Sequence, residues 1–367
     1  MKKILFLINT LRIGGAEKVL INTVNSYLKD KYDITVMTVI NDGELISELD
    51  SSVTYKSIIR FKSPLLKKLV LRLVGFVLPP SLVHRLFIGD CYDYEIAYLE
   101  GIATRIISGS SNRNSKKYAW VHIDLYNLFG IEKVFSSMEK HIRCYEKFDR
   151  IICVSKSVKD TFIKKFRDFG TIEVKYNIVD DTDIKTKACE RVDKPDKLRV
   201  VSVGRLELQK GYDRLLKIHK RLISEGYSYE LVLVGEGSLH SELEAYIRSN
   251  GLEANTVITG YAENPYKYMQ SADLLVFPSR AEGYSTVVTE AIILGKPVVV
   301  SDCSGMREIL GDSEYGLVTG NNEEDIYAGL KEMISNEGMR EQYRQKAEKR
   351  SKDFSMQTRL KELEQIF

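Results

Sequence analysis

Two stretches in the second half of the chain place polar side chains where a parallel sheet could bind a phosphate. The first, Glu282–Glu290, follows an apolar run at 274–277. Ser285 is a favourable N-cap for a helix that begins at Thr286, and Gly295 would end that helix. The amides at the helix start would face the carboxyl edge of a sheet, which attracts anionic oxygens.

Two carboxylates belong to this stretch. Glu290 would lie just over one turn inside the helix, where it could accept hydrogen bonds from the hydroxyls of a ribose. Glu282 precedes the helix, near the place where a sugar would follow the phosphates. Taken alone, two glutamates eight residues apart are more often solvated charges than ligand-binding groups, so the spacing by itself does not assign them a role.

The second stretch is Gly204–Gly211, directly after an apolar run at 198–203. Gly204 lets the backbone turn sharply at the end of a strand. Arg205 offers a planar fork and Lys210 a compact charge, and both suit a diphosphate. Solvated basic side chains are the alternative, but both residues flank a strand-to-helix turn of the domain that holds the helix start.

The elements that must position these residues alternate between strand and helix. A strand at 4–8, the loop with Gly14 and Gly15, a helix at 16–28 and a strand at 34–39 are typical of a doubly wound parallel sheet. The other predicted strands lie at 94–99, 117–122, 150–154, 198–203, 230–234, 256–258, 274–277 and 298–301.

These patterns predict an α/β chain of two Rossmann-like domains facing a cleft, which suits 367 residues. The first domain covers 1–180 and the second 198–354. Crowded acidic residues and few apolar ones indicate an interdomain linker at 181–197. We expect the C-terminal helix at 355–367 to pack back on the first domain.

Three motifs in order carry a family resemblance: G-R-L-x-x-x-K-G at 204–211, V-G-E-G at 234–237 and E-x7-E at 282–290. Together they resemble family 4 of the GT-B glycosyltransferases, the retaining sugar transferases. The resemblance implies that Arg205 and Lys210 hold the donor diphosphate and act in catalysis. It assigns Glu290 to the ribose hydroxyls and Glu282 to the donor sugar. The neighbouring donor-site residues would be Gly283, Tyr284, Ser285 and Thr286.

The first half resembles the family more loosely. Gly14 and Gly15 match its glycine loop, which approaches the donor phosphates, although an ordinary turn would look the same. His122 ends a predicted strand and resembles the family's active-site histidine, which contacts the donor sugar; a structural histidine is the alternative. The sequence departs from the family pattern at 177–180, where N-I-V-D replaces N-G-[IV]-D, and at 284–285, where Y-S replaces F-G.

The resemblance implies transfer of a sugar from a nucleoside-diphosphate sugar to an acceptor hydroxyl with retained configuration. The residues do not identify the nucleotide, the sugar or the acceptor. We favour a UDP-sugar over a GDP-sugar, and a lipid-linked glycan of a bacterial surface polysaccharide (capsule, exopolysaccharide or O-antigen). The alternatives are a nucleotide-sugar epimerase of related fold and a non-catalytic nucleotide-sugar-binding subunit. A nicotinamide-dependent oxidoreductase is disfavoured, because the first loop lacks G-x-G-x-x-G.

We expect neither a metal nor another cofactor. Asp181-Thr182-Asp183 spells the D-x-D of metal-dependent transferases, but it falls in the predicted linker. Basic side chains and helix-start amides can neutralise a diphosphate without Mg²⁺. The five cysteines are widely spaced and form no C-x-x-C pair, which excludes a zinc site or disulfide framework of the usual spacing and fits reduced thiols in a cytoplasm.

Charge is unevenly distributed along the chain. Residues 1–180 contain 28 Lys and Arg against 20 Asp and Glu, a balance of +8, whereas the whole chain carries +3. Within the basic half, Phe61–Leu78 alternates leucines with Lys62, Lys67, Lys68 and Arg72. Such a helix could lie on a membrane with anionic lipids, or it could pack on the core with a basic outer face. We predict a cytoplasmic protein at the inner face of the plasma membrane, with no nucleic-acid partner.

Overall fold

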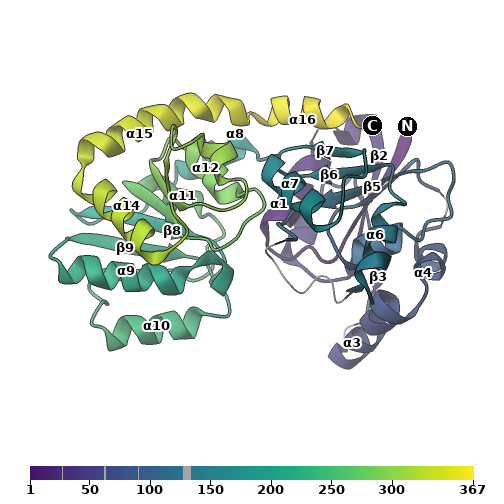
Figure 1. Ribbon diagram of the computed structural model, residues 1–367, viewed down its shortest axis with the longest axis horizontal. Helices are drawn as coiled ribbons and strands as arrows, with labels where there is room; N and C mark the ends of the chain where they lie inside the picture. Colours follow the sequence, from purple (N-terminus) through teal and green to yellow (C-terminus); the bar gives the residue numbers. More distant parts are fainter. Residues whose placement is uncertain (27, 62, 90, 127–133) are drawn as a thin grey trace. The chain divides into compact units, whose positions relative to one another are not determined.

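The protein is described by a computed structural model that covers residues 1–26, 28–61, 63–89, 91–126 and 134–367. It forms two compact units, one of Met1–Ile178 with Arg359–Phe367 and the other of Val179–Thr358 (Figure 1). Each unit is an α/β fold around one parallel sheet, which confirms the predicted fold class.

The N-terminal unit contains a seven-stranded parallel sheet in the order β3-β2-β1-β4-β5-β6-β7. Its strands are β1 (Lys2–Ile8), β2 (Tyr32–Ile40), β3 (Thr54–Ile59), β4 (Tyr94–Ala97), β5 (Lys116–Val121), β6 (Arg150–Cys153) and β7 (Ile172–Val174). Its helices are α1 (Gly15–Val24), α2 (Leu28–Lys31), η1 (Glu44–Glu48), α3 (Pro64–Arg72), η2 (Leu73–Val77), α4 (Pro80–Phe87), α5 (Ile102–Ile107), α6 (Met138–Tyr145) and α7 (Lys156–Lys165).

The C-terminal unit contains a six-stranded parallel sheet in the order β10-β9-β8-β11-β12-β13. Its strands are β8 (Leu198–Val203), β9 (Tyr229–Val234), β10 (Thr256–Ile258), β11 (Leu274–Phe277), β12 (Val298–Ser301) and β13 (Leu317–Thr319). Its helices are α8 (Asp181–Ala188), η4 (Leu208–Lys210), α9 (Tyr212–Ser224), α10 (His240–Ser249), α11 (Tyr266–Ser271), α12 (Thr286–Ile293), α13 (Met306–Leu310), α14 (Glu323–Ser335), α15 (Glu337–Arg350) and η5 (Ser351–Phe354).

Burial on both faces explains why the predicted strands read as continuous apolar runs. Every residue of β11 and β12 is buried, as is the run from Ile4 to Ile8 in β1. Helices supply this cover: α9 packs on α10 and α14, whereas α12 packs on α8 and α15 (Figure 1). Three strands escaped prediction, namely β3, β7 and β13. They lie at sheet edges, and β7 and β13 have only three residues, too few to show a periodicity.

The predicted linker at 181–197 is wrong in its first half, where the chain forms α8 and belongs to the C-terminal unit. Asp180 caps this helix, because its side chain accepts from the amides of Thr182 and Asp183 at 3.1 and 2.9 Å. Ile184 and Ala188 are buried. The acidic residues therefore form the first turn of a helix, where negative charge is favourable.

The last helix, α16 (Met356–Glu364), leads the chain end into the N-terminal unit. The ring of Phe367 packs on those of Tyr32 and Tyr94, with centroids 5.4 and 5.3 Å apart. Tyr118 donates its hydroxyl proton to the carbonyl of Ile366 at 2.7 Å. The structure thus places the end of the chain with the first unit.

Candidate active site

The order of each sheet defines where a ligand would bind. In both sheets successive strands are added on one side of the first strand and then on its other side. The strand order therefore switches between β1 and β4 in one sheet and between β8 and β11 in the other. In open α/β sheets, ligands bind at the carboxyl ends of the strands beside this switch point. The 204–211 loop leaves β8 and the 278–285 loop leaves β11, so both predicted stretches lie there.

The loop after β8 is shaped by close backbone approaches. Gly211 has φ +75°, and a Cβ there would lie 2.0 Å from the carbonyl oxygen of Pro278. In the V-G-E-G motif, a Cβ on Gly235 would lie 2.0 Å from the carbonyl oxygen of Gly204. The first two motifs of the resemblance therefore touch each other, and they need glycine because neighbouring backbone occupies the space of a side chain.

Lys210 and Glu282 join the two predicted stretches. Lys210 Nζ lies 2.6 Å from Glu282 Oε1, and their side chains are 18% and 9% exposed. The same carboxylate oxygen accepts a hydrogen bond from Ser279 Oγ at 2.7 Å. The loops also meet along their backbones, where Arg280 N–H donates to the carbonyl of Gln209 at 2.8 Å. The ammonium is thus held in place and keeps further donors for an anion.

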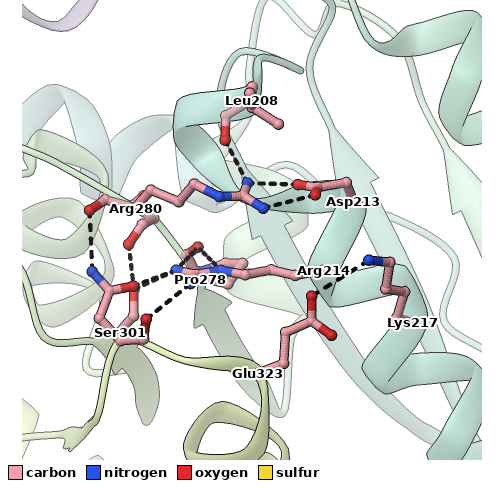
Figure 2. Close-up of polar contacts among 10 residues, drawn as sticks. Leu208, Asp213, Arg214, Lys217, Pro278, Arg280, Ser301 and Glu323 are labelled. Atoms are coloured by element: carbon pink, nitrogen blue, oxygen red, sulfur yellow. Dashed lines mark hydrogen bonds and ion pairs between the residues drawn. The ribbon is translucent and has the colours of Figure 1, made fainter. Parts of the chain in front are cut away.

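Two arginines brace the loop after β11 against α9 (Figure 2). Arg280 binds both carboxylate oxygens of Asp213 at 2.7 Å and donates to the carbonyl of Leu208. Burial opposes the charge of Asp213, but the hydrogen bonds and the charge of Arg280, together with backbone hydrogen bonds, lower the pKa of that carboxyl. Arg214 is buried and donates through Nε and Nη2 to the carbonyl of Pro278 at 2.9 and 2.5 Å.

Helix α12 begins at Thr286, as predicted, but Ser285 does not cap it as predicted. Ser285 occupies the N-cap position with extended backbone, yet its side chain makes no capping bond. The hydroxyl is buried, and within the described part of the chain it has no hydrogen-bond partner. The prediction that this side chain caps the helix is therefore wrong, although its backbone angles of φ −73° and ψ 109° resemble those of the capping Asp180, φ −83° and ψ 92°. A buried hydroxyl without a partner is costly, and a ligand oxygen would relieve that cost.

The remaining predicted donor-site residues differ in exposure. Gly283 and Tyr284 are buried beside Ser285, and Thr286 is half-buried at the first helical position. Glu290 is buried in the second turn of α12. The pKa of Tyr266 is raised mainly by the burial of its own hydroxyl and next by the negative charge of Glu290. Arg205 is exposed, and its side chain makes no hydrogen bond or ion pair among the described residues. Its guanidinium is thus available to an anion.

In the N-terminal unit, Gly14 and Gly15 begin α1 after β1. The carboxylate of Glu17 folds back over this helix start, because a Cβ on Gly14 would lie only 2.3 Å from Glu17 Oε2. A negative charge at a helix N-terminus is electrostatically favourable. The glycine thus leaves room for the acidic side chain of its own helix.

His122 directly follows β5 and is 7% exposed. Its ring lies against Tyr98, with centroids 4.8 Å apart, and neither ring nitrogen has a hydrogen-bond partner within the described residues. Burial lowers the pKa of His122 to about 3, so the imidazole is neutral at physiological pH. One nitrogen can therefore donate and the other accept.

Glu100 supports the backbone at His122 and was missed by the sequence reasoning. Its buried carboxylate accepts the N–H of His122 and that of Ile123, the latter at 3.1 Å. Burial raises the pKa of Glu100 to about 7, although these hydrogen bonds favour the charged form. The available signal was its position: Glu100 follows β4 as His122 follows β5, at the same edge of the sheet.

Both aspartates of the D-x-D sequence pair with lysines of their own helix. Asp181 lies 3.3 Å from Lys185 and Asp183 lies 2.8 Å from Lys187, both along α8. Among the residues that the structure describes, no group of three or more His, Cys, Asp or Glu side chains could hold a metal ion.

Comparisons with known proteins agree with this geometry. Residues 184–350 match the family model for glycosyl transferases group 1. The chain is 37% identical, over 57% of either chain, to the Campylobacter jejuni N-acetylgalactosamine-N,N'-diacetylbacillosaminyl-diphospho-undecaprenol 4-alpha-N-acetylgalactosaminyltransferase. It is 32% identical to the amylovoran biosynthesis glycosyltransferase of Erwinia amylovora over 46% of this chain and 47% of the relative. These alignments span about half the length of each relative.

The fold comparison covers the whole chain. The crystal structure of Anabaena HepE in complex with UDP superposes with a TM-score of 0.75 at 19% identity, covering 100% of this chain and 99% of that one. At this identity the likeness establishes the fold alone, whereas the sequence matches extend to the site loops. Residues 184–350 thus match the glycosyl transferases group 1 family, and the chain has the GT-B fold.

Proposed function

We propose that the protein transfers a sugar from a nucleoside-diphosphate sugar to an acceptor hydroxyl, with retention of configuration and without a metal. The observation that carries the proposal is the ion pair between Lys210 and Glu282, 2.6 Å apart, because it joins the two predicted stretches at the switch point of the C-terminal sheet. Together with Arg205 and the start of α12, it forms a site suited to a diphosphate.

Each group has a role in the departure of the diphosphate. As the bond to the sugar breaks, negative charge grows on the leaving phosphate, and groups already aimed at that charge stabilise it without reorganising. Lys210 is held by Glu282, so its remaining N–H donors are oriented before the donor binds. The amides at Thr286 and Val287 and the buried hydroxyl of Ser285 would add hydrogen bonds to phosphate oxygens.

The hydroxyls of the sugar and of the ribose are uncharged, so they are bound by groups that accept or donate hydrogen bonds. We assign Glu290 to the ribose hydroxyls and Glu282 to the donor sugar, following the family motif. His122 is neutral, because burial lowers its pKa to about 3, and it can exchange hydrogen bonds with a sugar hydroxyl as donor or acceptor. Glu100 positions His122 through the backbone and does not itself need to touch the substrate.

The nucleotide, acceptor and location are proposed from the relatives. HepE was crystallised with UDP, which favours a UDP-sugar over a GDP-sugar as the donor. The Campylobacter relative is named for a diphospho-undecaprenol acceptor, and the Erwinia relative for amylovoran biosynthesis. We therefore propose a lipid-linked glycan acceptor in bacterial surface polysaccharide assembly, used at the cytoplasmic face of the plasma membrane.

The test measures nucleotide binding to the full chain in EDTA, by thermal unfolding and calorimetry, with UDP, GDP, ADP and their sugars. Nucleotide at about 100 times its Kd should stabilise the fold by roughly 2.7 kcal/mol. Lys210→Ala and Glu290→Ala should weaken binding at least tenfold. Lys217→Ala is the matched control, because Lys217 is exposed and its one ion pair among the described residues is with Glu323 at 3.5 Å (Figure 2).

Product analysis separates the alternatives. Incubation with the bound nucleotide sugar and a membrane lipid extract should transfer labelled sugar to lipid. An isomerised nucleotide sugar without transfer would identify an epimerase, and an intact donor despite tight binding would identify a binding subunit. If a folded sample binds none of the nucleotides, the donor-site assignment is wrong.

A further inference from the structure

Two neighbouring helices of the N-terminal unit expose an unusual number of large apolar side chains. The predicted helix at 61–78 is in fact α3 followed by the one-turn π-helix η2, and α4 comes directly after Pro79 (Figure 1). None of the nine residues of α3 is buried. Lys62 lies outside the described residues. We call the outer surface of α3, η2 and α4 the α3–α4 face.

Helical spacing gathers the apolar side chains of the α3–α4 face. Leu65 and Leu69 are one turn apart in α3 and are 81% and 56% exposed. Leu82 and Leu86 repeat this spacing in α4, and Val77 between the helices is 61% exposed. A water-soluble helix normally buries its apolar stripe, so a helix with its leucines outward needs another cover. The alternative of a core-packing helix with a basic outer face is therefore contradicted for α3.

The inner side of the same segment is fixed firmly to the fold. Arg105 of α5 donates to the carbonyls of Val74 and Leu78 at 3.1 and 2.6 Å. Beneath α4, His84 Nε2 lies 2.8 Å from Glu95 Oε2, and both side chains are fully buried. The exposed apolar residues of η2 and α4 are thus presented by an anchored scaffold, which α3 directly precedes in the chain.

Charge identifies what covers the α3–α4 face. Residues 60–89 contain six Lys or Arg and no Asp or Glu. Lys68, Arg72 and Arg85 are exposed, and none of the three makes an ion pair among the residues that the structure describes. Beside α3, a groove of about 410 Å³ is lined by Lys67 and Lys68, with Arg12 and Asp42 opposite. Apolar side chains flanked by unpaired cations are complementary to the headgroups and acyl chains of an anionic bilayer.

We propose that the α3–α4 face docks on a bilayer of anionic phospholipids, with its leucines among the acyl chains and its cations at the phosphates. No described helix is long and apolar enough to cross a membrane. Docking of this kind is reversible and depends on both apolar burial and charge. The proposal does not depend on sugar transfer, since it concerns a surface and not the donor site.

The test is flotation of the full chain with vesicles of phosphatidylcholine alone or with phosphatidylglycerol. The wild type should float only with the anionic vesicles, and high salt should release it. Leu65→Ser/Leu69→Ser should lower partitioning at least tenfold. Lys68→Gln/Arg72→Gln should lower it about fivefold for each charge, as expected for cations near an anionic surface.

The matched control is Met138→Ser/Val257→Ser, which removes two side chains of 44% and 43% exposure outside the α3–α4 face and should leave flotation unchanged. Thermal unfolding and UDP binding should be alike in all variants, so a failed donor site remains distinguishable from failed docking. Equal flotation with neutral vesicles, or flotation unaffected by Leu65→Ser/Leu69→Ser, overturns the proposal. The wild type could instead fail to float and form a dimer that Leu65→Ser/Leu69→Ser makes monomeric. That result overturns the proposal and shows that a second copy of the chain covers the α3–α4 face.

Discussion

Glu100→Gln offers a direct test of the buried carboxylate behind His122. Burial raises the pKa of Glu100 from its ordinary 4.5 to about 7, so the native state holds a proton more tightly than the unfolded chain. Stability from this group is complete below pH 4.5 and is lost as the pH rises through 7. A difference of about 2.5 pH units corresponds to about 3 kcal/mol. Glutamine cannot titrate, and its amide oxygen can still accept the two backbone protons.

The assay is urea unfolding of both proteins at pH 5, 6, 7 and 8, followed by tryptophan fluorescence. Trp120 is the single tryptophan of the chain and is buried in β5, so its fluorescence reports on the N-terminal unit. We expect the free energy of unfolding of Glu100→Gln to rise by about 2.5 kcal/mol relative to the wild type between pH 5 and pH 8. Glu139→Gln, an exposed carboxylate on α6, serves as the control.

His122 contributes in the opposite direction, because its folded pKa of about 3 lies below the ordinary 6.5. Its stability is present above pH 6.5 and is lost as the pH falls towards 3. Both proteins carry this contribution, so it cancels in their difference. A difference between Glu100→Gln and wild type that stays constant from pH 5 to pH 8 would refute the assignment of a raised pKa to Glu100.

Three further outcomes are expected. Ser285→Ala should leave the Tm without nucleotide unchanged or higher, because it removes a buried hydroxyl that has no partner among the described residues. The same variant should bind UDP about tenfold more weakly by calorimetry. An unchanged affinity would exclude a role of this hydroxyl in ligand binding. Gly211→Ala should lower the free energy of unfolding in urea by about 2–5 kcal/mol, because the residue has a positive φ and a Cβ would collide with Pro278. Gly251→Ala, at φ +65° with open space around it, should lower it by only about 1–2 kcal/mol. His122→Ala should lower kcat/KM roughly ten- to hundredfold, and the wild-type pH–rate profile should show no titration of His122 above pH 5, since its pKa is about 3.

The fold was readable from sequence where burial is two-sided. Strands such as β11 and β12 are apolar throughout, so each appears as a short continuous run between polar segments. The linker error shows the limit of composition, because an acidic stretch was interpreted as solvated. Its spacing held the better signal: Asp181 and Asp183 each precede a lysine by four residues, which is the pairing of a helix surface.

For the candidate site, sequence identified the loops but not the contacts between them. The ion pair of Lys210 and Glu282 joins residues 72 positions apart, and only the order of β8 and β11 in the sheet brings them together. The missing cap of Ser285 depends on the orientation of one side chain, which no residue pattern specifies. Glu100 shows the same limit, since burial, which sequence does not report, makes this carboxyl unusual.

The candidate site residues of the two units differ in charge, and the proposed nucleotide-sugar substrate would account for the difference. In the C-terminal unit, Lys210 and Arg280 are already paired with carboxylates at 2.6 and 2.7 Å. A diphosphate remains anionic throughout transfer. Cations that are already held in place can therefore stabilise it without reorganising as its negative charge grows. In the N-terminal unit, burial keeps His122 neutral and favours the protonated form of Glu100. Sugar hydroxyls are neutral donors and acceptors, and a neutral imidazole can match either role without an unpaired buried charge.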